Sequence, residues 1–279
     1  MSTFWQRLLS GMVYVALVVA SILVHPIFFG ALFGIVTMLA VHEYHRLVGS
    51  TCFTTIGSTL AGGFLFMIAW CVFQVETINL AESVYMQCAY LGFVGLLLIA
   101  ELWLRQADPV RNWGNILISQ LMIALPFASM NLILDESKYW LLALFITIWM
   151  NDTGAYCVGC LTAKRKNGNH KMFPRVSPKK SWEGLIGGFV CALLAGYVFY
   201  LVGWIDSLPK ALVLSVVIAV AGTLGDLMES LLKRSIGAKD SGRFLPGHGG
   251  VLDRFDSILL AGPVITAFCW ICYLIAPLF

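Results

Sequence analysis

Residues 210–232 read KALVLSVVIAVAGTLGDLMESLL, an almost unbroken apolar stretch with two acids near its end. A helix of roughly 20 mostly apolar residues crosses the hydrocarbon core of a bilayer, and this stretch has that length. If Arg234 lies at headgroup level, Asp226 lies below the membrane surface, because the helix rises only about 1.5 Å per residue. The stretch therefore predicts a transmembrane helix that carries a costly intramembrane carboxylate.

The composition of the chain extends this prediction to the whole fold. Hydrophobic residues make up 59% of the 279 residues and charged residues 12%, and the mean hydropathy is +0.84. An ordinary soluble domain of this length is excluded. We expect an all-α, polytopic integral membrane protein with nine transmembrane helices, at 8–25, 27–44, 54–73, 84–104, 115–134, 138–157, 183–204, 210–232 and 257–277.

The loop charges predict the orientation of these helices. With the N-terminus in the cytoplasm, all but two of the 18 Lys and Arg residues fall on the cytoplasmic side, as the positive-inside rule requires. The two exceptions are Lys138 and Lys210. The resulting basic inner face suits anionic lipid headgroups or nucleotides, and nothing in the sequence calls for a nucleic-acid partner.

Polar residues are distributed unevenly along the chain. Residues 1–135 alternate apolar spans with short loops and are expected to form a scaffold of transmembrane helices. Residues 136–279 carry two long cytoplasmic loops, 158–182 and 233–256, which hold most of the basic residues and several helix-breaking Gly and Pro residues. We expect this second part to be the catalytic region.

The end of the eighth predicted span carries a polar stripe. Spacings of three, four, seven and eight residues from Asp226 place these side chains on one helical face, and the stripe comprises Asp226, Glu229, Ser230, Lys233 and Arg234. An alternative is an internal ion pair with a lysine that only holds helices together.

The next segment, KDSGRFLPGHGGVLDRFDS at 239–257, combines glycines with acids. Glycines such as Gly249 and Gly250 let backbone N–H groups approach an anion, as in phosphate-binding loops. Asp253 and Asp256 stand three residues apart where the ninth helix begins, and carboxylates in that arrangement can share a hard cation. Helix capping by the two acids is the alternative.

Two further stretches precede the seventh span. NDTGAY places Asp152 near the cytoplasmic end of the sixth span, and PRVSPKKSWEG supplies Ser177, Lys179 and Lys180. The lysines also fit simple topology anchors, and Ser177 with Pro178 fits an ordinary turn. In HEYHR at 42–46, we expect His42 and His45 to cap the end of an interfacial helix rather than to bind a metal.

The stretch SLLKRSIGAKDSGRFLPGHGGVLDRFDS, residues 230–257, resembles the signature of the phosphatidate cytidylyltransferases, also called CDP-diacylglycerol synthases. Every fixed position of the signature is matched. DTGAY and SPKKSWEG are similar to other recurring elements of that family, and the nine-span layout fits it. The chain departs from the family at Ser181, where threonine is common, and in the longer, more basic connection at 160–171.

The resemblance implies transfer of CMP from CTP to phosphatidic acid, which gives CDP-diacylglycerol and pyrophosphate for phospholipid biosynthesis in the bacterial inner membrane. It implies Mg²⁺ and leaves a second cation and a homodimer open. Asp226 and Asp253 are the expected metal ligands, with Asp256 and Asp152 as weaker candidates. The expected catalytic residues are Asp226, Asp253, Lys233, Arg234, Lys239, Asp240, His248 and Arg254. The expected substrate-binding residues are Ser177, Lys179, Lys180, Ser230, Gly249 and Gly250.

Two rival functions remain. A CTP-dependent lipid kinase acting on a polyprenol, of the dolichol-kinase type, would transfer the γ-phosphoryl group, but the D-R-x-D end of the signature argues against it. A cation transporter would use Asp226 in its ion path. Transporters tend to carry inverted repeats and broken helices in both halves, whereas the polar residues here are concentrated in one half.

Overall fold

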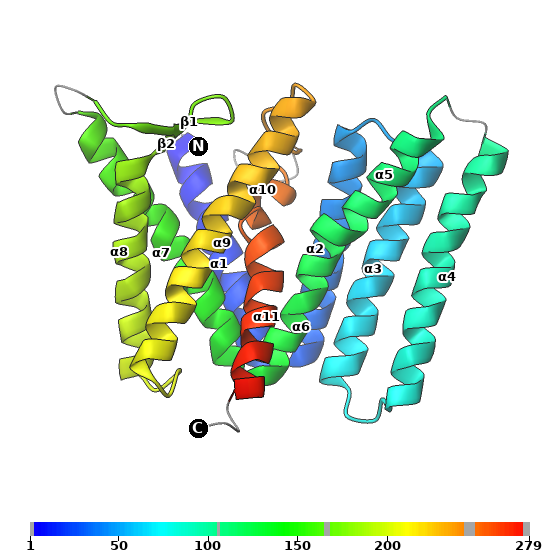
Figure 1. Cartoon of the computed structure of the whole chain (residues 1–279), viewed down its shortest axis with the longest axis horizontal. Helices are drawn as coiled ribbons and strands as arrows, with labels where there is room; N and C mark the ends of the chain where they lie inside the picture. The colour runs from blue at the N-terminus through cyan, green and yellow to red at the C-terminus, as the bar shows by residue number, and fades with distance from the viewer. Residues whose placement is uncertain (1–2, 105–106, 165–167, 243–248, 276–279) are drawn as a thin grey trace. The chain divides into compact units, whose positions relative to one another are not determined.

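A computed structural model describes residues 3–104, 107–164, 168–242 and 249–275, with side chains described from residue 9 to residue 273. The expected all-α, polytopic membrane fold is confirmed (Figure 1). Within the described residues, eight helices are long and apolar enough to cross a membrane. The first predicted span is also helical, and its described apolar part runs from Leu9 to Val24.

Contacts divide the chain into two compact units. Unit 1 comprises Met1–Asp135 and Ile236–Phe255, and unit 2 comprises Glu136–Ser235 and Asp256–Phe279. Residues 236–255 therefore pack with unit 1, although we expected them to belong with the rest of 136–279. The assignment of scaffold and catalytic roles to the two parts of the chain stays a prediction, as does the cytoplasmic position of the N-terminus.

Three helices of unit 1 begin after a residue whose side chain caps them, namely His25, Thr51 and Asp108. Asp108 accepts a hydrogen bond from the Arg111 backbone N–H, and Pro109 follows at the first helical position, where a missing N–H costs nothing. The elements are α1 (Thr3–Val24), α2 (Pro26–Leu47), α3 (Cys52–Gln74), α4 (Leu80–Leu104), α5 (Pro109–Ser119), the π-helical turn η1 (Gln120–Ala124), α6 (Leu125–Glu136) and the short α10 (Leu252–Phe255).

An aromatic cluster anchors α10 within unit 1. The Phe255 ring is buried and packs edge-on against Phe33 of α2, with 5.8 Å between ring centroids. It makes similar contacts with Phe127 of α6 at 5.5 Å and Tyr14 of α1 at 5.4 Å. Edge-to-face aromatic pairs add about 0.5–1.5 kcal/mol each beyond area burial. The C-terminal end of the glycine-rich segment is therefore held by three helices of the unit.

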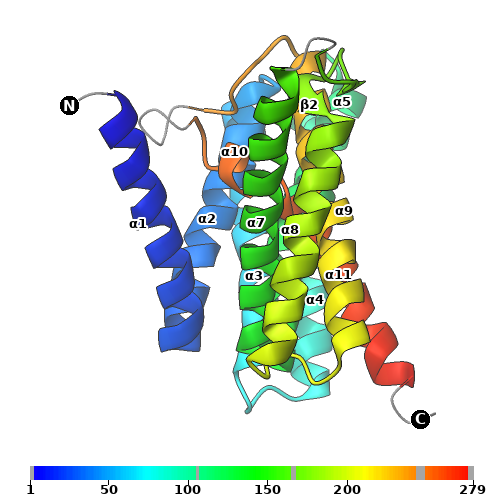
Figure 2. The same cartoon turned by 90° about the vertical axis from the view of Figure 1, so that its left-hand side faces the viewer.

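Unit 2 contains four long helices and a hairpin. The helices are α7 (Lys138–Ala163), α8 (Trp182–Leu201), α9 (Leu208–Ser235) and α11 (Ile258–Ile275), and Figure 2 shows α7, α8 and α9 side by side. Between α7 and α8, strands β1 (Lys171–Phe173) and β2 (Ser177–Ser181) pair antiparallel, with Lys171 opposite Ser181 and Phe173 opposite Ser177.

The hairpin corrects two local expectations. Ser177 and Pro178 do not form a turn but begin β2, because the strand pairing with β1 takes up this segment. The predicted loop 158–182 is also partly helical, since α7 continues to Ala163.

Glycines let α8 approach its neighbours closely. A Cβ on Gly188 would lie 2.8 Å from the Asn151 carbonyl oxygen of α7, and a Cβ on Gly196 would lie 2.8 Å from the Ala211 carbonyl oxygen of α9. Small residues at such contacts let helix backbones pack tightly in a membrane, where apolar side chains gain little by leaving lipid. Backbone contact on α8 therefore fixes the spacing of α7, α8 and α9.

Replacing Gly196 with leucine should destabilise the protein, because backbone atoms on α9 cannot yield as a side chain would. Overpacking of this kind typically costs about 1–3 kcal/mol, so we expect a clearly lowered melting temperature in detergent. Gly92→Leu is the matched control, since a Cβ on Gly92 meets no atom within 4 Å. Equal melting temperatures for the two variants would contradict the close α8–α9 contact.

Candidate functional site

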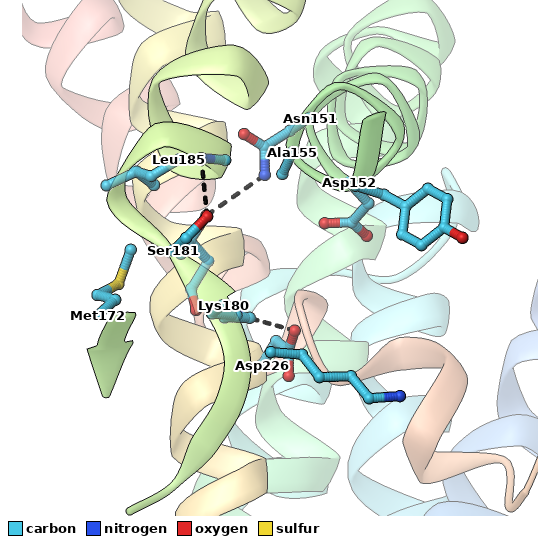
Figure 3. Close-up of a pocket in the computed structure, with 12 residues that line it drawn as sticks. Asn151, Asp152, Ala155, Met172, Lys180, Ser181, Leu185 and Asp226 are labelled. Atoms are coloured by element: carbon cyan, nitrogen blue, oxygen red, sulfur yellow. Dashed lines mark hydrogen bonds and ion pairs between the residues drawn. The ribbon is translucent and has the colours of Figure 1, made fainter. Parts of the chain in front are cut away.

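A pocket of about 240 Å³ opens within unit 2. Helix α7 contributes its NDTGAY segment, strand β2 contributes two lysines, and α9 contributes the acid at the start of its polar stripe (Figure 3). The lining residues are Asn151, Asp152, Ala155, Tyr156, Met172, Lys179, Lys180, Ser181, Gly184, Leu185, Thr223 and Asp226. Three stretches selected from the sequence therefore meet in one pocket.

An ion pair joins strand β2 to helix α9 in this pocket. Lys180 Nζ lies 2.7 Å from Asp226 Oδ2 and donates a further hydrogen bond, at 3.3 Å, to the Thr223 carbonyl oxygen. Both charged side chains are about three-quarters buried, with exposed fractions of 24% and 30%. Lys180 is thus more than a topology anchor, because it neutralises an acid on a membrane-length helix.

The strand delivers Lys180 to this position because its end is tied to α8. Ser181 is the N-cap of α8, and its Oγ accepts a hydrogen bond of 3.1 Å from the Gly184 backbone N–H. A Ser cap satisfies one of the N–H groups that every helix start leaves unpaired. The hydroxyl that this chain shares with the family's common threonine therefore has a structural use.

Helix α7 adds an amide and a second acid. Asn151 Nδ2 donates to Thr223 Oγ1 at 3.3 Å, and Asn151 Oδ1 is a buried oxygen with no hydrogen-bond partner among the described residues. The Asp152 carboxylate faces the same pocket in Figure 3. The pocket therefore offers amide and carboxylate oxygens, which are the ligands that a hard cation prefers.

The polar stripe on α9 contains a second ion pair. Lys233 Nζ lies 2.5 Å from Glu229 Oε2, and the Glu229 side chain is fully buried. Ser230 Oγ donates to Asp226 Oδ1 at 3.2 Å. Helix α9 therefore carries the predicted polar stripe, and one part of that stripe is an internal ion pair, which was the alternative interpretation.

Arg234, at the end of the stripe, contacts the hairpin. Its Nε donates a hydrogen bond of 3.4 Å to the Val176 carbonyl oxygen, between β1 and β2. The last turn of α9 is therefore linked to the turn of the same hairpin, in addition to the Lys180–Asp226 pair.

Asp256 belongs to unit 2 and begins the segment that leads into α11. Its Oδ1 accepts a hydrogen bond of 2.6 Å from the Ser257 backbone N–H. A Cβ on Gly225 would lie 2.8 Å from the Asp256 carbonyl oxygen, so α9 meets this segment by backbone contact. Asp256 therefore lies beside α9, the helix that carries Asp226 and Glu229.

No three His, Cys, Asp or Glu side chains of the described residues already lie close enough together to hold a metal ion. Lys180 pairs with Asp226 and Lys233 pairs with Glu229. The expected ligand set of Asp226, Asp253, Asp256 and Asp152 stays a prediction.

Asp253 lies on α10 in unit 1, where it holds the glycine-rich segment. Its Oδ2 accepts hydrogen bonds of 2.8 Å from the backbone N–H groups of both Ser241 and Gly250. Gly249 has a φ of +83°, and a Cβ there would run into Asp253 Oδ2. The Asp253 carboxylate thus accepts hydrogen bonds from N–H groups near the start of α10, as a helix-capping residue does, and capping was the alternative interpretation of this acid.

The remaining predicted residues lie in several settings. Lys239 and Asp240 are exposed after α9, Arg254 lies on α10, and Ser177 opens β2, where Lys179 is exposed. His248 lies outside the described residues.

Sequence reasoning missed three residues that the structure places among these polar clusters. Asn151 and Thr223 line the pocket of unit 2 and hydrogen-bond to each other. Glu43, from HEYHR on α2, accepts hydrogen bonds from the Val251 and Leu252 backbone N–H groups of unit 1. A carboxylate at the end of an apolar span was the available signal for Glu43.

The same stretch, HEYHR, places its histidines differently from each other. His45 is buried, and its Nδ1 lies 2.9 Å from Ser50 Oγ just beyond the end of α2, which agrees with a capping role. His42 instead lines a second pocket in unit 1.

Comparison with known proteins adds independent findings. Residues 5–272 match the model of a family described as the cytidylyltransferase family. A phosphatidate cytidylyltransferase of Haemophilus influenzae is 32% identical over 94% of this chain and 97% of its own length. One of Staphylococcus saprophyticus is 42% identical over 47% of this chain, so that match spans about half of the relative's length, 49%.

The Lys180–Asp226 pair should show energetic coupling in a double-mutant cycle. Lys180→Met leaves a partly buried carboxylate without its cation, so we expect a lowered melting temperature in detergent. Lys180→Met with Asp226→Asn should recover part of the loss, with a coupling of about 1 kcal/mol because both groups retain some contact with water.

Lys179→Met is the matched control for this cycle, since Lys179 is the exposed neighbour on the same strand. Additive effects of the Lys180 and Asp226 substitutions would show that the pair contributes nothing to stability.

Proposed function

The chain belongs to the cytidylyltransferase family, and from this premise we propose that it transfers CMP from CTP to phosphatidate. A phosphate oxygen of phosphatidate forms a bond to the α-phosphorus of CTP, and the bond between that phosphorus and the bridging oxygen of the β-phosphate breaks. CDP-diacylglycerol and pyrophosphate are the products. The full-length similarity to the Haemophilus phosphatidate cytidylyltransferase supports this substrate pair.

The observation that carries the proposal is the pocket of unit 2, where lysines and acids meet beside a membrane-length helix. The phosphate of phosphatidate is already anionic near neutral pH, so its attack needs no strong base. The reaction instead needs charge neutralisation and in-line positioning of two anionic substrates. Lysines next to oxygen-rich acids supply the first of these requirements.

The carboxylates of unit 2 fit a hard divalent cation in chemistry, because Mg²⁺ prefers oxygen ligands and uses few protein groups. Asp226 would hold it, with Asp256 and Asp152 as further candidates, and Asp253 on α10 stays a predicted ligand. When bound, Mg²⁺ neutralises charge on the triphosphate and on the departing pyrophosphate. A second cation stays open.

The basic residues of the proposed site differ in whether they already pair with an acid. Lys179 is exposed at the pocket and is a direct candidate for a substrate phosphate, whereas Lys180 already neutralises Asp226. A substrate phosphate would have to share Lys180 with that acid. Further phosphate contacts are proposed for Lys233, Arg234, Lys239 and Arg254, with hydroxyl contacts from Ser177 and Ser230.

The protein is a multi-pass membrane protein, and its bacterial relatives suggest the cytoplasmic membrane. Phosphatidate would enter the site sideways from the bilayer, since each buried CH₂ contributes about 0.8 kcal/mol to keeping it there. CTP would arrive from the cytoplasm. A homodimer stays a prediction from the resemblance.

Two labels on CTP distinguish the proposed reaction from its rivals. Purified protein with phosphatidate and Mg²⁺ should move label from the α-phosphorus of CTP into lipid and leave γ-label in pyrophosphate. A lipid kinase would instead transfer the γ-label to lipid in a parallel reaction supplied with a polyprenol. A transporter would transfer neither.

Asp226→Asn in this assay should lower turnover at least about tenfold and raise the Mg²⁺ requirement, because a ligand charge is lost. Asp206→Asn is the matched control, since Asp206 is an exposed acid before α9. Normal Mg²⁺ dependence of the Asp226 variant would remove Asp226 from the proposed cation site.

Orientation provides a separate test. In a cysteine-free background, Asp240→Cys should be protected in intact spheroplasts from a membrane-impermeant maleimide, and Asp206→Cys should be labelled. The expectation follows from the positive-inside distribution of Lys and Arg. Labelling of position 240 from outside would place the proposed site on the wrong side for CTP.

A further inference from the structure

Glu43 lies near the C-terminal end of α2 and binds a segment about 200 residues later in the chain. Its Oε1 accepts a hydrogen bond of 2.9 Å from the Val251 N–H, and its Oε2 accepts one of 3.0 Å from the Leu252 N–H. Ser241 Oγ donates to Oε2 at 3.2 Å. One carboxylate thus satisfies three donors at the two ends of the glycine-rich segment. Hydrogen bonds to an ionised group are roughly twice as strong as those between neutral groups.

Two signature glycines are explained by the same carboxylate. A Cβ on Gly242 would lie 2.7 Å from Glu43 Oε1, and a Cβ on Gly250 would collide with Glu43 Oε2 and Ser241 Oγ. Neither position leaves room for a side chain while Glu43 is in place. Close approach of a carboxylate is therefore sufficient reason for glycine at both positions, without any bound phosphate.

Ser241 connects Glu43 to Asp253. The Ser241 hydroxyl donates to Glu43 and accepts a hydrogen bond of 3.3 Å from the Asp253 N–H, while the Ser241 N–H donates to Asp253 Oδ2 at 2.8 Å. Ser241 is almost fully buried. Glu43 therefore acts on Asp253 both through Ser241 and through the backbone at the start of α10.

A cavity lies beside Ser241 and Gly242. Together with Leu39, His42, Glu43, Arg46 and Leu47 they line a pocket of about 610 Å³ in unit 1. The cavity therefore borders the contact between Glu43 and Ser241.

We propose that Glu43 is a positioning residue that holds Asp253 in the orientation it needs as a cation ligand. This inference rests on the proposed function, which makes Asp253 such a ligand. Glu43 itself touches neither substrate nor metal in this proposal. Outer residues that orient metal ligands typically contribute about 10–100-fold to metal affinity or activity.

The test compares Glu43→Gln with Glu82→Gln in purified full-length protein. The glutamine amide group cannot accept a hydrogen bond from the donors that now face one oxygen of Glu43. Glu82 is a fair control, because it is exposed and accepts a backbone hydrogen bond of 3.0 Å from Asn79 at the start of α4. Three quantities are measured for each variant. They are the binding of Mn²⁺ alone, followed by electron paramagnetic resonance, the melting temperature, and the Mg²⁺ dependence of turnover.

We expect Glu43→Gln to weaken Mn²⁺ binding and raise the Mg²⁺ requirement about tenfold or more, with the protein still folded and Glu82→Gln unchanged. Ser241→Ala should shift both measurements in the same direction but less, and it decides the question if Glu43→Gln does not fold. A lowered melting temperature with unchanged Mn²⁺ affinity in the folded protein would overturn the proposal. If the wild type made no CDP-lipid, the proposed function would fail, while the Mn²⁺ measurement would still decide the role of Glu43.

Discussion

A carboxylate on a membrane-length helix must have a partner, and much of unit 2 follows from providing one for Asp226. An unpaired charge at the centre of a membrane helix costs about 2.5–3.5 kcal/mol on insertion scales, which give the lowest values. Lys180, on strand β2, offsets this cost, because its Nζ lies 2.7 Å from Asp226 Oδ2. To reach Asp226, the lysine needs a strand beside α9, and the strand needs a fixed end, which the Ser181 cap of α8 provides. The hairpin, the cap and the ion pair therefore form one arrangement.

Close helix packing holds this arrangement in place. Glycines on α8 bring its backbone into contact with the backbones of α7 and of α9. Gly225 brings the backbone of α9 into contact with the segment before α11. In lipid, such contacts replace the hydrophobic driving force that packs helices in water. The polar groups of unit 2 are thus held by helices whose spacing is set by backbone atoms, which leaves little freedom for side chains to move apart.

In unit 1, carboxylates bind backbone N–H groups instead of a lysine. The glycine-rich segment has many backbone donors, and Glu43 and Asp253 satisfy four of them between Ser241 and Leu252. Phe255 anchors the same segment in an aromatic cluster. The signature is therefore partly a structural motif, and the acids that look catalytic in sequence also hold backbone. In a site of this kind, losing one acid changes both the charge and the shape of the loop.

The sequence alone determined the membrane fold, because the length and hydropathy of each span depend on local composition and on the thickness of a bilayer. It also identified the family and the four charged residues of the pocket, Asp152, Lys179, Lys180 and Asp226, since the signature and the NDTGAY and SPKKSWEG segments are local patterns. The sequence could not show that Lys180 pairs with Asp226, that Ser177 opens a strand, or that Glu43 binds the glycine-rich segment. Each of these contacts joins residues from about 45 to more than 200 positions apart or depends on a strand partner. Only the tertiary structure decided them, because hydrogen bonds and ion pairs depend on distances of about 3 Å, which no periodicity along the chain encodes.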